Sequence, residues 1–104
     1  MSLFEFAIIP SDGSKTPQER FEEFHRANPS VYQELRRLAL ILKNRGHKRI
    51  GISMLFEQMR WQWYATTTDV TGFKLNNNYR AYYARMLMEN EEGLDGFFTI
   101  RESK

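Results

Sequence analysis

One helical stripe constrains this chain more than any other feature. Its apolar side chains recur at spacings of four, three and four residues, at Val31, Leu35, Leu38 and Leu42. That rhythm predicts an α-helix with one buried side. Asn28-Pro29 just before it is typical of a helix start, and Gly46 after it can take the left-handed conformation that ends many helices. We therefore expect a central helix with a basic outward face.

A second helix is predicted upstream by the segment Thr16-Pro17-Gln18-Glu19. Threonine suits the N-cap, proline suits the first helical position, and the glutamate can close a capping box. Phe21 and Phe24 then give this helix its buried edge. Residues 1–15 are expected to form an N-terminal strand and loop.

Beyond Gly46, Ile50 and Ile52 point the same way if the chain is extended, which predicts a brief strand over residues 47–52. Ser53 is the expected cap of a helix over residues 54–64. That helix is too rich in large groups for one narrow stripe, so at least one of Trp61 and Trp63 should be exposed.

The remaining elements are a connection over residues 65–75, a helix over 79–89 capped by the asparagines at 76–78, and a closing strand over 96–101. The expected fold class is mainly α with a small β component (α+β), with about four helices plus short strands. Residues 1–104 form a single domain, of which 16–104 are the helical core with its closing strand. This order resembles a winged helix-turn-helix domain. The connection of about eleven residues is longer than the tight turn of that motif.

Several segments together also resemble a family of small uncharacterised proteins encoded by phages and prophages. The LNNNY segment at 75–79 and the YARMLM segment at 83–88 are the most specific. The others are Phe24-His25-Arg26-Ala27-Asn28-Pro29, Arg49-Ile50-Gly51-Ile52 and Gly96-Phe97-Phe98. The resemblance covers roughly four-fifths of the chain. It implies a phage-related setting near nucleic acid and supplies no activity for individual residues.

Positive charge is concentrated in the middle of the chain. Residues 35–88 hold ten basic side chains and two acidic ones, whereas the whole chain has a net charge of +2. A basic segment without compensating acids favours contact with phosphate. We expect nucleic acid, most of all duplex DNA, to be bound by Arg45, Lys48, Arg49, Lys74, Asn77, Asn78, Arg80, Tyr82, Arg85 and Arg101.

The last long helix supplies the centre of that expected surface. With Tyr83 on its buried side, Asn77, Asn78, Tyr82 and Arg85 project away. Asparagine can read adenine, and arginine can read guanine or grip phosphate. Other interpretations stay open for the same residues: the asparagines as helix caps, Arg85 paired with Glu89, and Tyr82 in the core.

An enzyme is not expected, because His25 and His47 are isolated and the chain has no cysteine and no glycine-rich phosphate loop. No metal and no cofactor are predicted. The longest aliphatic run is too short to span a membrane, so we expect a soluble protein of the bacterial host cytoplasm. The alternative function is a small protein-interaction module that binds a host or phage partner. A homodimer would be compatible with either function.

Overall fold

Helices dominate the part of the chain that the computed structural model describes, residues 15–66 and 75–99. In chain order the helices are α1 (Pro17–Ala27), α2 (Pro29–Asn44), α3 (Ile52–Thr66) and α4 (Arg80–Asn90). Two short 3₁₀ helices, η1 (Asn77–Tyr79) and η2 (Glu92–Leu94), flank α4. Strands β1 (Ile50–Gly51) and β2 (Phe98–Thr99) form a two-stranded sheet. The prediction of a mainly α fold with a small β component is confirmed.

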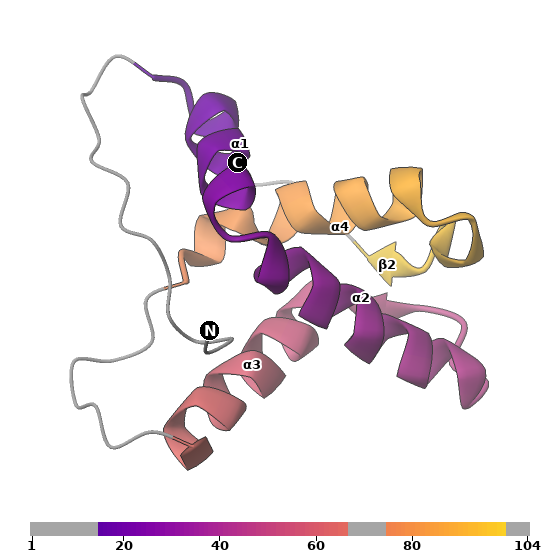
Figure 1. Ribbon diagram of the computed structural model, residues 1–104. Helices are drawn as coiled ribbons and strands as arrows, with labels where there is room; N and C mark the ends of the chain where they lie inside the picture. Colours follow the sequence, from indigo (N-terminus) through magenta and orange to yellow (C-terminus); the bar gives the residue numbers. More distant parts are fainter. Residues whose placement is uncertain (1–14, 67–74, 100–104) are drawn as a thin grey trace.

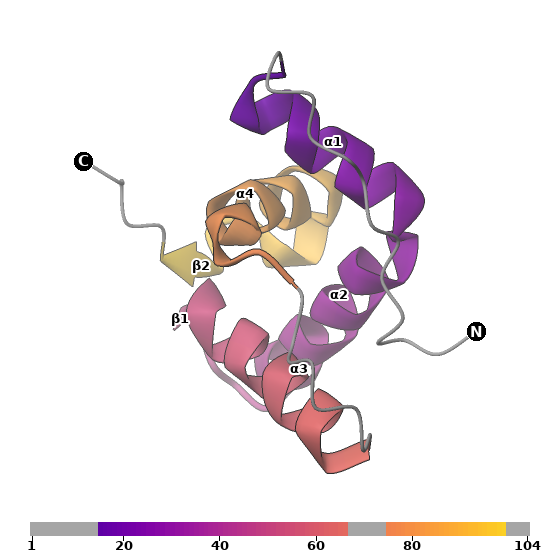
Figure 2. The same ribbon diagram turned by 90° about the vertical axis from the view of Figure 1, so that its left-hand side faces the viewer.

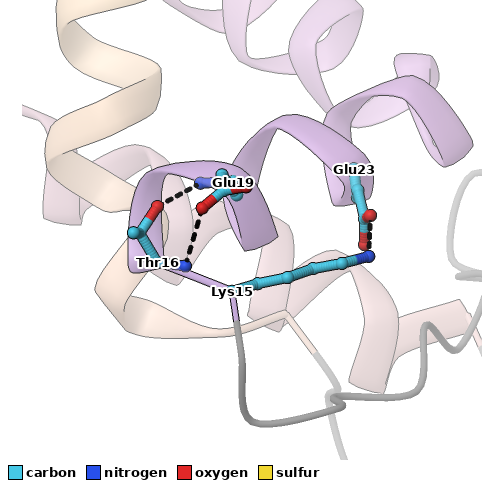
Figure 3. Close-up of polar contacts among 4 residues, drawn as sticks. All are labelled: Lys15, Thr16, Glu19 and Glu23. Carbon is cyan, nitrogen blue, oxygen red and sulfur yellow. Dashed lines mark hydrogen bonds and ion pairs between the residues drawn. The ribbon is translucent and has the colours of Figure 1, made fainter.

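The start of α1 has the predicted capping box (Figure 3). The Thr16 hydroxyl accepts a hydrogen bond from the Glu19 amide at 3.2 Å, and the Glu19 carboxylate accepts one from the Thr16 amide at 3.1 Å. Lys15 adds an ion pair to Glu23. Because helix-start amides lack intrahelical partners, these contacts define where α1 begins.

The end of α2 is set by Gly46, as predicted. Its φ of +100° lies in the left-handed region. The Gly46 amide donates to the Lys43 carbonyl and the His47 amide donates to the Leu42 carbonyl, which is the Schellman pattern. Asn28 corrects one expectation at the other end. Its side chain makes no capping bond to α2 and instead donates to the Phe24 carbonyl of α1 at 3.1 Å.

The boundary between β1 and α3 differs from the prediction. Ile52 is the first residue of α3 rather than part of a strand, and Ser53 lies inside the helix rather than capping it. The strand therefore keeps only Ile50 and Gly51. Ile52 is buried, so its burial is achieved through the helix and needs no extended backbone. The prediction of one exposed tryptophan is confirmed, since Trp61 is 65% exposed and Trp63 only 5%.

Helices α1, α2 and α3 converge on the buried side of α4 (Figure 1). Figure 2 looks along α4 and shows α1, α2 and α3 arranged around it. Tyr83 is fully buried at the centre, with its ring 4.8 Å from that of Phe21 on α1 and 6.2 Å from that of Phe56 on α3. The side of α4 that lies between α1 and β2 in Figure 2 faces none of the described helices. Three described helices thus pack against α4, and no described helix covers its fourth side.

The sheet joins the middle of the chain to its C-terminal part. β1 and β2 pair in parallel, with Ile50 opposite Phe98 and Gly51 opposite Thr99. Of the terminal strands that a wing would need, β2 is the one found within residues 75–99. The predicted strand near the N-terminus and the last two residues of the predicted 96–101 strand involve positions outside the described residues.

Candidate nucleic-acid interface

The orientation of α4 follows the predicted pattern. Tyr83, Ala84 and Leu87 are fully buried, whereas Arg80 and Arg85 are exposed. At about 100° per residue, Arg85 lies roughly 160° around the helix from Tyr83. Its side chain therefore leaves α4 on the side opposite the core.

Tyr82 corrects part of that pattern. It was expected to project away from the core, but its ring stacks on Phe21 at 5.0 Å with an interplanar angle of 14°. The guanidinium of Arg85 lies 5.3 Å from the centre of the same ring, within range of a cation–π contact. Arg85 forms no ion pair with Glu89, so that alternative is wrong. Tyr82 is thus a half-buried support that carries an exposed cation.

The asparagine run has two roles. The Asn76 side chain accepts a hydrogen bond from the Asn78 amide at 2.8 Å and caps η1. Asn77 and Asn78 are exposed, and the Asn77 backbone carbonyl accepts from Arg80 Nε at 3.0 Å. Capping therefore accounts for the side chain of Asn76, while Asn77 and Asn78 are exposed to solvent beside α4.

The second group of predicted contacts lies between α2 and β1. Arg45, Lys48 and Arg49 are all exposed. The ion pairs found within residues 15–66 and 75–99 include none of the three. This connection therefore carries three solvent-facing cations on a short stretch of backbone that Gly46 fixes in place.

The cations of α2 are held very differently, and their partners were not predicted from sequence. Arg36 Nε donates to Glu91 at 2.6 Å, and the Tyr32 hydroxyl donates to the other oxygen of the same carboxylate at 3.0 Å. These bonds, from Arg36 first and Tyr32 second, lower the pKa of Glu91 below its usual value. Lys43 donates to the Gly93 carbonyl. The acidic segment after α4 thus folds back onto the basic face of α2.

Two further arginines pair within their own helices. Arg37 makes a two-pronged contact with Glu34, at 2.7 and 2.6 Å. Arg60 lies 3.4 Å from Glu57. Carboxylates that neutralise a guanidinium at this range remove much of its attraction for phosphate. The arginines of α2 and α3 in the basic middle of the chain are therefore paired with carboxylates, whereas those at 45, 49, 80 and 85 have no carboxylate partner among the described residues.

The two groups without carboxylate partners lie at different ends of the molecule. In Figure 1, η1 and the start of α4 are at the left, whereas the connection from α2 to β1 is at the right. In Figure 2, β1 and β2 lie on the same side as the uncovered side of α4. The predicted residues therefore form two separate groups rather than one patch. Lys74 and Arg101 lie outside the described residues.

Some buried polar groups lie behind this surface. The Tyr83 hydroxyl has no hydrogen-bond partner among the described residues, and burial raises its pKa. His25 packs against Tyr32 and Tyr83, and burial lowers the pKa of its imidazole. The described part of the chain contains no cluster of histidine and carboxylate side chains that could hold a metal ion.

Comparisons with protein-family models, curated proteins and solved structures return no match. None of the helices in residues 15–66 and 75–99 combines the length and apolarity that a membrane span requires.

Proposed function

We propose that this chain binds nucleic acid, with duplex DNA as its main ligand, through the exposed side of α4 and the connection at residues 45–49. In this proposal it is a small DNA-binding protein of phage or prophage origin with a winged-helix-like organisation. The observation that carries the proposal is the sorting of arginines. Those on α2 and α3 are paired with carboxylates, whereas Arg80 and Arg85 on α4 have no such partner within residues 15–66 and 75–99.

The chemistry of the α4 surface suits a groove reader. Exposed amides at Asn77 and Asn78 can accept and donate along the edge of an adenine, and a guanidinium can grip guanine or phosphate. Arg85 is supported by the Tyr82 ring, which itself rests on Phe21. A side chain supported in this way loses less conformational freedom on binding than a free one.

The cations at residues 45–49 suit a different task. They lie on an irregular connection rather than a helix, at the opposite end of the molecule from the start of α4 (Figure 1). Contacts with the sugar–phosphate backbone set the register of a protein on a duplex and supply salt-dependent affinity without reading bases. In our proposal Arg45, Lys48 and Arg49 hold phosphates while α4 faces the groove.

The experiment is a salt titration of binding to a mixed-sequence duplex, compared with a single strand of the same sequence. The wild-type chain should bind the duplex at low salt, and the logarithm of its affinity should fall linearly with the logarithm of salt concentration. Arg85→Ala should weaken binding roughly tenfold through loss of one strong contact. Lys48→Ala with Arg49→Ala should reduce the salt slope by about two phosphate equivalents.

A matched control is Arg37→Ala, which removes the same charge from a residue that Glu34 already neutralises. It should leave affinity and salt slope close to wild type. Absence of binding at low salt would overturn the proposal. A partner protein that survives nuclease treatment in a co-purification, from a chain without nucleic-acid affinity, would favour the protein-interaction alternative.

A further inference from the structure

The outward face of α3 is apolar although it is exposed. Within residues 15–66 and 75–99, four large hydrophobic side chains are exposed, and three belong to α3: Met54 at 49%, Trp61 at 65% and Tyr64 at 56%. Met54 and Trp61 are two turns apart and lie on the same side of the helix. The opposite side of α3 is buried through Leu55, Phe56, Met59 and Trp63. A helix that is apolar on both sides is typical of one that is covered on both sides.

Charge on this helix argues against a phosphate-rich occupant. Glu57 and Arg60 are the ionised side chains of α3, and they pair with each other. The face therefore has no net charge with which to attract a nucleic-acid strand or an acidic or basic partner. A surface that matches it has to be neutral and apolar as well, and a second α3 meets that condition.

We propose that the exposed face of α3 is the contact surface of a homodimer, in which α3 packs antiparallel against α3 of a second copy. In this arrangement a two-fold axis passes near Gln58, which is exposed and one turn from both Met54 and Trp61. Met54 of each copy then meets Tyr64 of the other, a favourable thioether–aromatic contact. The two-fold symmetry repeats this Met54–Tyr64 contact on both sides of the axis.

The available area fits a weak, symmetric dimer. Large aromatic side chains offer about 150–250 Å² each, so Met54, Trp61 and Tyr64 together expose roughly 400 Å² per copy. Two copies and their polar rim reach about 1,000 Å², the lower end of specific interfaces. We therefore expect an equilibrium between monomer and dimer that depends on concentration.

Dimerisation would also supply what one copy lacks for DNA binding, a step that rests on the proposed function. A two-fold pair would double the exposed cations of α4 and of residues 45–49 and would present two α4 helices to two half-sites. The dimer itself is argued from α3 alone. Its test therefore uses no nucleic acid, and the two proposals fail separately.

The test is sedimentation velocity of the full chain over a wide concentration range. The wild-type chain should shift from monomer to dimer as concentration rises. Trp61→Glu should stay monomeric, because a buried pair of carboxylates would be strongly unfavourable. Ile41→Gln is the matched control, since Ile41 is an exposed hydrophobic residue on α2 at 39%, and it should dimerise like wild type.

Cross-linking gives a second measurement that does not depend on disruptive variants. The chain has no cysteine, so Gln58→Cys introduces the sole thiol, placed near the proposed axis. Oxidation should link two Gln58→Cys copies in high yield, whereas Gln33→Cys on the exposed part of α2 should not be cross-linked.

Three results would overturn the proposal. They are a wild-type chain that is monomeric at every concentration, a Trp61→Glu variant that dimerises normally, and equal cross-linking of both cysteine variants. Protection of Trp61 only when a single-stranded oligonucleotide is added would assign the face to base stacking instead.

Discussion

Helices α2 and α4 both carry arginines on their outward sides, yet the two surfaces differ in charge. On α2, Arg36 and Arg37 each donate to a carboxylate. On α4, Arg80 bonds a backbone carbonyl and Arg85 lies over an aromatic ring. The contrast teaches that charge counted along a chain is a poor guide to the charge presented at its surface. What matters is which cations the fold supplies with a counter-ion.

Weakening the packing of α4 on the core should produce the largest effect on stability, because the surface of α4 that is compared with α2 depends on that packing. Leu87 is fully buried on the core side of α4. Leu87→Ala leaves a cavity and should lower the free energy of unfolding by about 2–5 kcal/mol, as measured by urea denaturation. Glu89→Ala on the exposed side of the same helix should change it by less than about 0.5 kcal/mol. A similar loss for both variants would mean that α4 does not pack on the core as described.

The charge pairing of α2 can be tested by acid. The bonds from Arg36 and Tyr32 hold the pKa of Glu91 below its ordinary value of 4.5. A carboxylate with a lowered folded-state pKa adds stability that is fully present above the unfolded value and is lost as pH falls through the folded one. The urea concentration at the midpoint of unfolding should therefore decrease as the pH is lowered below about 4.5.

Glu91→Gln should reduce that acid-dependent loss and lower stability at neutral pH. The exposed residue Glu89 provides the control, since Glu89→Gln should keep the acid dependence of the wild-type chain. His25 acts in a separate window. Burial lowers the pKa of its imidazole, so its unfavourable contribution begins as pH falls through its unfolded value near 6.5. If Glu91→Gln lost as much stability at low pH as the wild-type chain, the contact between Glu91 and Arg36 would add no stability.

The smallest expected effect concerns the side of α4 that faces the core. Because the buried Tyr83 hydroxyl lacks a partner among the described residues, Tyr83→Phe removes a polar group without removing the ring. The variant should be as stable as wild type or more stable by up to about 1 kcal/mol in urea or thermal unfolding. A loss of more than about 1 kcal/mol would show that the hydroxyl is hydrogen-bonded in solution.

Local signals in the sequence predicted local structure well. The capping box at Thr16 and the helix end at Gly46 both follow from interactions within a few residues, where spacing fixes geometry. The errors at Ile52 and Asn28 share one feature, since each residue lies at the boundary of two neighbouring elements and can belong to either.

The candidate site was less predictable because its electrostatics depend on long-range contacts. Arg36 and Glu91 are 55 residues apart in the chain, and no spacing rule relates them. Tyr82 was placed on the outward side of α4 by helical geometry alone, yet α1 lies close enough for Phe21 to cover it. The position of one helix beside another is a property of the whole core, and residue order within α4 does not contain it.

The parallel pairing of β1 with β2 has a consequence for the order in which the chain can fold. Ile50 meets Phe98, and Glu91 meets Tyr32 and Arg36, so the contacts that close the structure join its middle to its last described residues. During synthesis, α1, α2 and α3 leave the ribosome before α4, whose Tyr83 fills their centre. Contacts of such sequence separation slow folding, because a long loop must be ordered first. Until α4 has been synthesised, Phe21 and Phe56 on the earlier helices lack the Tyr83 ring that packs against them. The nascent chain is therefore prone to aggregation during this period.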